Sequence, residues 1–163
     1  MTQALIRPAM GPIAEYGKAH WIDEAAHLPD PAATYKIVFS VSGPSKRPDA
    51  ANAGLERVAR AVNLYSMSGV TPDRLICVAV IHGEATASVL QDPQHQAYDG
   101  TPNPNANLIA AIQRAGVEVS VCAQAMIANG FNKDGLLAGV TRSLSALTTI
   151  TVLQHDGYSL MPL

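Results

Sequence analysis

The stretch Ala-Gly-Val-Glu-Val-Ser-Val-Cys-Ala-Gln, residues 115–124, decides the fold. It predicts a turn at Gly116, a β-strand over 117–121, and a cysteine where that strand runs into a helix. In a parallel α/β sheet, the carboxyl ends of the strands form the crevice where ligands bind. A thiol there meets the partially positive N-terminus of the next helix, which favours the nucleophilic thiolate. The stretch therefore indicates a parallel α/β sheet and a candidate chemistry at Cys122.

On both sides of this stretch, strands and helices alternate along the chain. Strands are predicted over 35–41 and 75–81, with a weaker strand at 140–142 and an edge strand at 158–161 that stops at Pro162. Helices are indicated between them by apolar residues at helical spacing: Leu55, Val58, Val62 and Tyr65, then Leu108, Ile112 and Ala115, then Leu144, Leu147, Ile150 and Leu153. A short helical piece is predicted over 125–128, and no element is predicted over 91–101. The alternation predicts an α/β fold, a three-layer domain with a mostly parallel five-stranded sheet flanked by helices.

Residues 1–34 form an N-terminal arm ahead of the α/β domain, which covers 35–163. Prolines at 8, 12, 29 and 31 favour extended or turn backbone over helix in the arm. Its large side chains, Tyr16, Trp21, Ile22 and Leu28, predict that the arm docks on the domain. Residues 1–12 have neither the basic start nor the apolar core of an export signal. The chain as written is thus expected in the cytoplasm, and in the periplasm if a signal has been removed.

Composition predicts contacts between subunits. Only 15% of the residues are charged, against about 25% in an average soluble domain. The helix predicted over 145–154 has no charged residue, so it should be buried on more than one side, the second against another subunit. The net charge of −2 gives no basic footprint for nucleic acid. No stretch is long and apolar enough to span a bilayer.

Three loops should meet at the carboxyl edge of the sheet. They contain residues 42–46, His82-Gly83-Glu84 and Cys122-Ala123-Gln124. A thiol site there has a nucleophile at Cys122, a proton partner at His82 and a polar group at Gln124. Asn107, outside these loops, offers a second polar group. The residues leave other interpretations open: a buried, inert thiol at Cys122, a loop histidine at His82 that bonds a backbone carbonyl, and a carboxylate at Glu84 that only favours a helix start.

Other chemistries have no support in the sequence. The histidines lack metal-ligand spacing, so a zinc site built from His82, Glu84 and Cys122 is not favoured, and no cofactor is predicted. The dinucleotide, phosphate-loop, serine-hydrolase and Cys-x-x-Cys motifs are missing. The second cysteine, Cys77, lies in the apolar run 75–81 and is predicted to be a small core side chain.

An ordered series of short motifs resembles the DsrE/DsrF-like sulfur-relay family. The motifs are Tyr35-Lys36-Ile37-Val38-Phe39, Val80-Ile81-His82-Gly83, Asn103-Pro104-Asn105, the stretch 115–122 with Gln124, and the ending with Gly157-Tyr158 and Pro162. The resemblance implies a five-stranded α/β domain that forms homotrimers or homohexamers. It also implies that Cys122 is the cysteine that carries a persulfide in sulfur-relay members. Ala123 stands where many members have glycine.

Two functions follow from the sequence and the resemblance. In the first, Cys122 accepts sulfane sulfur, holds it as a persulfide and passes it to a partner thiol, so a sulfur donor or acceptor protein is expected as a partner. His82 then tunes the charge, and Gly83, Gln124 or backbone amides hold the bound group. In the second, the protein is a non-catalytic oligomeric module whose crevice, lined by His82, Asn107 and Gln124, binds a small molecule while Cys122 only packs.

Overall fold

The core of the protein is a parallel sheet in the order β6-β5-β4-β3-β7. The computed structural model describes residues 6–8 and 11–163. The strands are β3 (Tyr35–Val41), β4 (Leu75–Ile81), β5 (Glu118–Cys122), β6 (Thr141–Ser143) and β7 (Ser159–Pro162). All four strand pairings in this sheet are parallel. The predicted sheet is therefore confirmed, and it is parallel throughout rather than mostly parallel.

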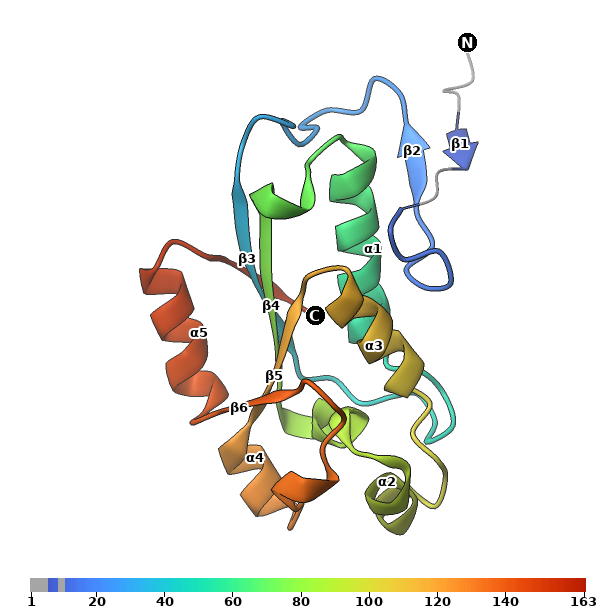
Figure 1. Cartoon of the computed structure of the whole chain (residues 1–163), viewed down its shortest axis with the longest axis vertical. Coiled ribbons are helices and arrows are strands. Elements are labelled where there is room, and N and C mark those ends of the chain that lie inside the picture. Colours follow the sequence, from blue (N-terminus) through green and yellow to red (C-terminus); the bar gives the residue numbers. More distant parts are fainter. Residues whose placement is uncertain (1–5, 9–10) are drawn as a thin grey trace.

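Helices cover both faces of the sheet, as expected for three layers. Helices α1 (Ala53–Met67) and α3 (Ala106–Arg114) lie on one face, and α5 (Ala146–His155) lies on the other (Figure 1). The strand sequences explain both layers, because successive residues point to opposite faces. Ile37, Phe39 and Val41 belong to the larger buried cluster, whereas Val38, Val78 and Val80 belong to the smaller cluster under α5.

Shorter elements gather at the carboxyl end of the strands (Figure 1). They are η2 (Gly83–Val89), α2 (Asp92–Asp99), α4 (Ala123–Ala128) and η3 (Lys133–Gly135). A further short helix, η1 (Pro72–Arg74), lies directly before β4. Helix α2 corrects the expectation of no element over 91–101. It begins with a proline in its first turn and ends at Gly100 in the left-handed conformation, but only His95 in it is buried. A helix with a single buried side chain has no apolar periodicity to reveal it.

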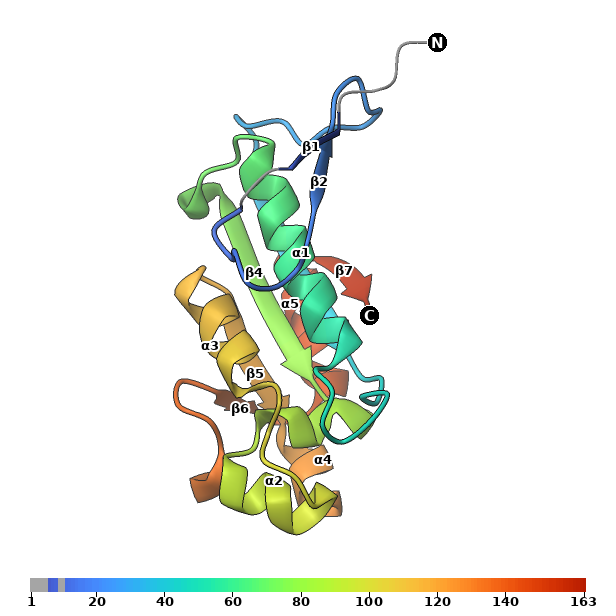
Figure 2. The ribbon, with the colours of Figure 1, turned by 90° about the vertical axis from the view of Figure 1, so that its right-hand side faces the viewer.

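The N-terminal arm docks on the outer side of α1 (Figure 2). It includes an antiparallel ribbon of β1 (Ile6–Pro8) and β2 (His20–Ile22). Ile13 is buried, and Tyr16 packs against the core. The arm residues Ile22 and Leu28 stay about half exposed. Ile13, rather than these two, is thus the principal apolar anchor, because it alone of the three reaches the core.

The buried side chain of Asn63, in α1, makes hydrogen bonds to the arm between Ile13 and Gly17. Its oxygen accepts from the Ile13 backbone N–H at 3.0 Å. Its amide N–H groups donate to the carbonyl oxygens of Ile13, Tyr16 and Gly17 at 2.9, 3.1 and 3.0 Å. Glu56 accepts from the Gly17 N–H at 2.8 Å. These bonds satisfy arm backbone groups that docking removes from water.

No helix in the described part of the chain has the length and apolar character needed to cross a bilayer.

Cys77 lies in the core, as predicted, and burial raises the pKa of its thiol to about 12. Cys77→Ala should lower the free energy of unfolding by about 1 kcal/mol because it leaves a small cavity. It should leave the labelling of Cys122 unchanged. Denaturant titration and thiol labelling of the native protein measure the two effects. Native-state labelling of Cys77 as fast as that of Cys122 contradicts the prediction.

Candidate thiol site at the carboxyl end of the sheet

Cys122 lies at the junction of a strand and a helix. It is the last residue of β5 and the N-cap residue of α4, and its backbone is still extended, with φ −66° and ψ 114°. Its side chain faces the α5 layer, where it belongs to the small cluster with Val80 and Ala146. The predicted place of the cysteine at the strand end is therefore what the structure shows.

The beginnings of two helices converge on the Cys122 sulfur. Burial acts to raise the pKa of Cys122, but the polar groups at the two helix starts outweigh it and hold the pKa below its ordinary value. These groups are the backbone N–H groups of Ala146, Ala125 and Gln124 and the hydroxyl of Ser145. Two belong to the first turn of α4, and two belong to the start of α5. Because nearby N–H dipoles and the partial positive charge of a helix start both favour an anion, this arrangement stabilises the thiolate.

The Cys122 thiol is covered rather than open to solvent. The residue is 5% exposed. Gln124 in the first turn of α4 and Leu144 just before α5 are both exposed. A reagent or partner therefore needs local movement of the surrounding chain to reach the sulfur.

His82 directly follows the neighbouring strand, β4. Its predecessor Ile81 pairs with Val121, so His82, just after β4, and Cys122, the last residue of β5, occupy corresponding places. The His82 Nε2 atom lies 2.8 Å from the Ser40 hydroxyl, with which it shares a hydrogen bond. Burial lowers the pKa of His82, so the ring is neutral at neutral pH. The groups that lower the Cys122 pKa come from α4 and α5, whereas the imidazole is engaged with β3.

The other predicted site residues are only partly brought together. The Gln124 side chain is exposed, and the residue reaches the sulfur through its backbone N–H. Asn107 is exposed in the first turn of α3. The important residues that the sequence did not assign to the site are Ser145 and Ala146. A serine directly before an apolar helix was the available signal, because serine is a favoured N-cap, and Ser145 does accept from the Leu147 N–H at 3.2 Å.

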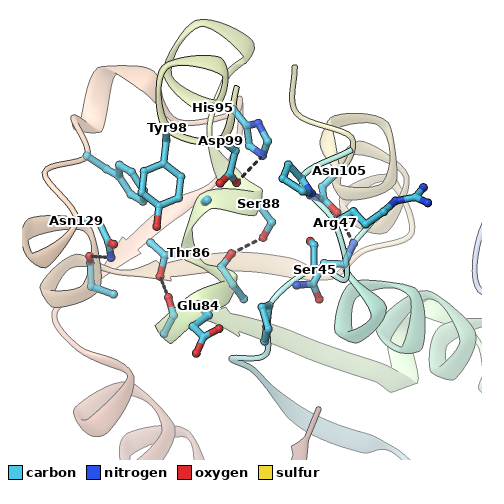
Figure 3. Close-up of a pocket in the computed structure, with 18 of the residues that line it drawn as sticks. Ser45, Arg47, Glu84, Thr86, Ser88, His95, Tyr98, Asp99, Asn105 and Asn129 are labelled. Atoms are coloured by element: carbon cyan, nitrogen blue, oxygen red, sulfur yellow. Dashed lines mark hydrogen bonds and ion pairs between the residues drawn. The ribbon is translucent and has the colours of Figure 1, made fainter. Parts of the chain in front are cut away.

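A separate cavity of about 590 Å³ opens at the same end of the sheet (Figure 3). The loop after β3, η2, α2 and the end of α4 surround it. Gly83 lines this cavity, but His82, Asn107, Gln124 and Cys122 do not. Within residues 6–8 and 11–163, no three His, Cys, Asp or Glu side chains group closely enough to hold a metal ion.

Comparison with known proteins identifies the family. The DsrE/DsrF-like family model matches residues 35–163, and the chain belongs to this family. No curated protein matches the sequence.

Two solved structures are similar in fold. One is MTH1491 of Methanobacterium thermoautotrophicum, described as a protein of unknown function, with a TM-score of 0.61 and 17% identity over 79% of this chain and 99% of that one. The other is the ychN protein of E. coli, with a TM-score of 0.58 and 14% identity over 80% of this chain and 100% of that one. Their likeness supports the α/β fold, and the family suggests a role related to sulfur relay.

Proposed function

We propose that the protein carries sulfane sulfur as a persulfide on Cys122 and passes it to a partner thiol. The observation that carries this proposal is the position of Cys122 at the start of α4 and against the start of α5, whose N–H groups and Ser145 hydroxyl lower its pKa. A cysteine that only packs needs no such donors, as the uncharged, buried Cys77 illustrates.

The lowered pKa serves both halves of the transfer. The Cys122 thiolate attacks the outer sulfur of a donor persulfide, so a new S–S bond forms while the donor's S–S bond breaks and its thiolate leaves. In the second half, an acceptor thiolate attacks the outer sulfur on Cys122, and the Cys122 thiolate leaves. A low pKa raises the fraction of attacking thiolate and makes Cys122 a better leaving group. Neither step changes the total number of electrons on the sulfurs.

The donors around Cys122 also suit the persulfide. A persulfide is an anion at neutral pH, and the helix starts of α4 and α5 supply N–H groups where that charge develops. The cover over the sulfur slows reaction with water and small oxidants. A donor or acceptor protein that displaces the starts of α4 or α5 on docking gains access to the sulfur.

Mass spectrometry tests the carrier function directly. After incubation with a low-molecular-weight persulfide and removal of the excess, the intact protein should be one sulfur atom heavier. The adduct should disappear with a reducing thiol, persist in Cys77→Ala and be absent from Cys122→Ser. An adduct retained in Cys122→Ser, or none in the wild type under conditions that load a free cysteine, contradicts the proposal.

We also propose that α5 faces a second copy of the chain, in a homotrimer or homohexamer. Leu147 and Val152 of α5 are 84% and 57% exposed, and Ile76 and Leu160 beside them are each 40% exposed. No residue of α5 carries a fixed charge. Apolar surface of this kind marks an interaction site.

Light scattering at micromolar protein should therefore give the mass of a trimer or a hexamer. Leu147→Glu should shift the mass towards the monomer, because it places a charge in the apolar contact. Leu28→Glu changes an exposed apolar residue of the arm and serves as the control. A monomeric wild type, or the same oligomer in the Leu147 variant, contradicts the arrangement.

A further inference from the structure

We propose that the cavity between η2, α2, α4 and the loop after β3 binds a small zwitterion, a molecule with an ammonium group, a carboxylate and an apolar substituent. This site does not include Cys122 and does not depend on the carrier function. Its volume of about 590 Å³ falls within the range of roughly 300–1,000 Å³ typical of ligand pockets. It also lies at the carboxyl ends of parallel strands, where such folds bind ligands.

Two exposed side chains at the cavity carry an unmatched charge of each sign. Lys46, in the loop after β3, and Glu84, in η2, both line it. Among the described residues neither has an ion-pair partner, whereas the neighbouring Arg47 is paired with Asp49 at 3.0 Å. A ligand carboxylate is therefore attracted to Lys46, and a ligand ammonium to Glu84.

Buried hydroxyl groups supply further acceptors for the ammonium. Thr86 and Ser88 line the cavity and are 1% and 4% exposed. Each donates its proton to a backbone carbonyl, Thr86 to Gly83 at 2.7 Å and Ser88 to Ala85 at 2.6 Å (Figure 3). Because their protons are engaged, these hydroxyl oxygens can only accept from a ligand.

A second carboxylate strengthens the acidic side of the cavity. The Nδ1 atom of His95 lies 2.7 Å from the Thr101 carbonyl oxygen, which can only accept, so Nδ1 carries the proton. The Nε2 atom then faces Asp99 at 3.7 Å, which is beyond ordinary hydrogen-bond length (Figure 3). The negative charge of Asp99 therefore has only this distant partner in the protein.

The remaining wall is apolar. The rings of Tyr98 and Phe131 meet edge to face, with centroids 4.8 Å apart, and both line the cavity. Tyr98 is 53% exposed, so part of its ring is free to pack against a ligand. The alanines at 85, 87, 125 and 128 line the cavity without filling it. This wall fits an apolar or aromatic substituent.

L-Phenylalanine is a suitable probe because it has all three groups, and two analogues each lack one charge. L-Phenylalaninamide has no carboxylate, and N-acetyl-L-phenylalanine has no ammonium. In calorimetric or NMR titrations of the wild type, L-phenylalanine should bind about fivefold or more tightly than either analogue.

Two variants assign each charge to its partner. Lys46→Gln should abolish the preference for phenylalanine over its amide and keep the preference over the N-acetyl form. Glu84→Gln should do the reverse, and Lys133→Gln, which removes an exposed lysine outside the cavity, should change neither. Such paired comparisons isolate the individual contacts.

Absence of binding at millimolar phenylalanine, equal binding of all three compounds, or affinities unaffected by both variants overturns the proposal. Thermal melting shows that each variant is folded. The sulfur adduct on Cys122 provides a separate readout: it should form normally in Lys46→Gln and Glu84→Gln, so failure of the zwitterion site and failure of the carrier function are distinguishable.

Discussion

Ser145→Asp should slow the alkylation of Cys122 at neutral pH by about tenfold or more, because it removes one donor to the sulfur and adds a negative charge beside it. Burial, acting alone, raises the Cys122 pKa, and the donors reverse the sign. One fewer donor and one added anion should move the pKa back up. Aspartate is itself a good N-cap, so α5 keeps its capping oxygen. The loss should therefore appear in thiol reactivity rather than in folding.

The pH profile of alkylation measures this effect. Only the thiolate reacts, so the rate rises with pH through the thiol pKa. In the wild type the midpoint should lie below that of an ordinary cysteine, and in Ser145→Asp it should move to higher pH. Ser145→Ala, which removes the donor without adding charge, should move it less.

His82→Ala is the matched comparison. If the neutral, Ser40-bonded imidazole has no electrostatic part in the activation, this variant leaves the midpoint where it is. An upward shift with His82→Ala comparable to that with Ser145→Asp assigns the activation to His82 instead. A midpoint in Ser145→Asp equal to that of the wild type contradicts the role of the α5 helix start.

Gly17→Ala should lower the free energy of unfolding by about 3 kcal/mol or more, through a clash combined with backbone strain. Gly17 has a φ of +62°, which side chains with a Cβ rarely adopt. A Cβ there would also overlap the backbone of α1 at Ala59 and Arg60. Because a helix backbone cannot yield as a side chain can, the segment around Gly17 should separate from α1.

Gly130→Ala separates the two causes. Gly130 has a similar φ of +69°, but a Cβ there would meet nothing within 4 Å. Gly130→Ala should lower the free energy of unfolding only through backbone strain, by about 1 kcal/mol. Denaturant unfolding of both variants gives the difference, and limited proteolysis reports on the arm. Equal losses of stability in the two variants contradict close docking of the arm on α1.

The parts of the fold that the sequence predicts are those with strong apolar patterns. Strand β4 is nearly all apolar because both of its faces are buried, and the spacing of Leu55, Val58 and Val62 places α1 on one face. Helix α2 escapes prediction because its one buried side chain, His95, gives it no apolar periodicity. The hydrogen bonds of Asn63 to the arm could not be predicted either. A lone asparagine in a helix ordinarily faces solvent, whereas Asn63 is 3% exposed.

The candidate site shows the same division. The position of Cys122 follows from the order of strand and helix, which is local in sequence. The contact of its sulfur with Ser145 and Ala146 depends on how β6 and α5 return over the end of the sheet. Cys122 and Ser145 are more than twenty positions apart in the sequence, and no spacing rule along the chain predicts that they lie close together. The cavity likewise combines four separate elements that become neighbours only in the folded protein.

With residues 11–18 laid along it, α1 is closed to other molecules on the side where the arm docks. The Cys122 sulfur lies on the opposite face of the sheet, under α5. Because α5 is proposed to face a second copy of the chain, a visiting protein approaches the sulfur past the strand ends, and that route does not cross the arm. The outward-facing side chains of the arm can consequently diverge in evolution without changing which partners reach the thiol.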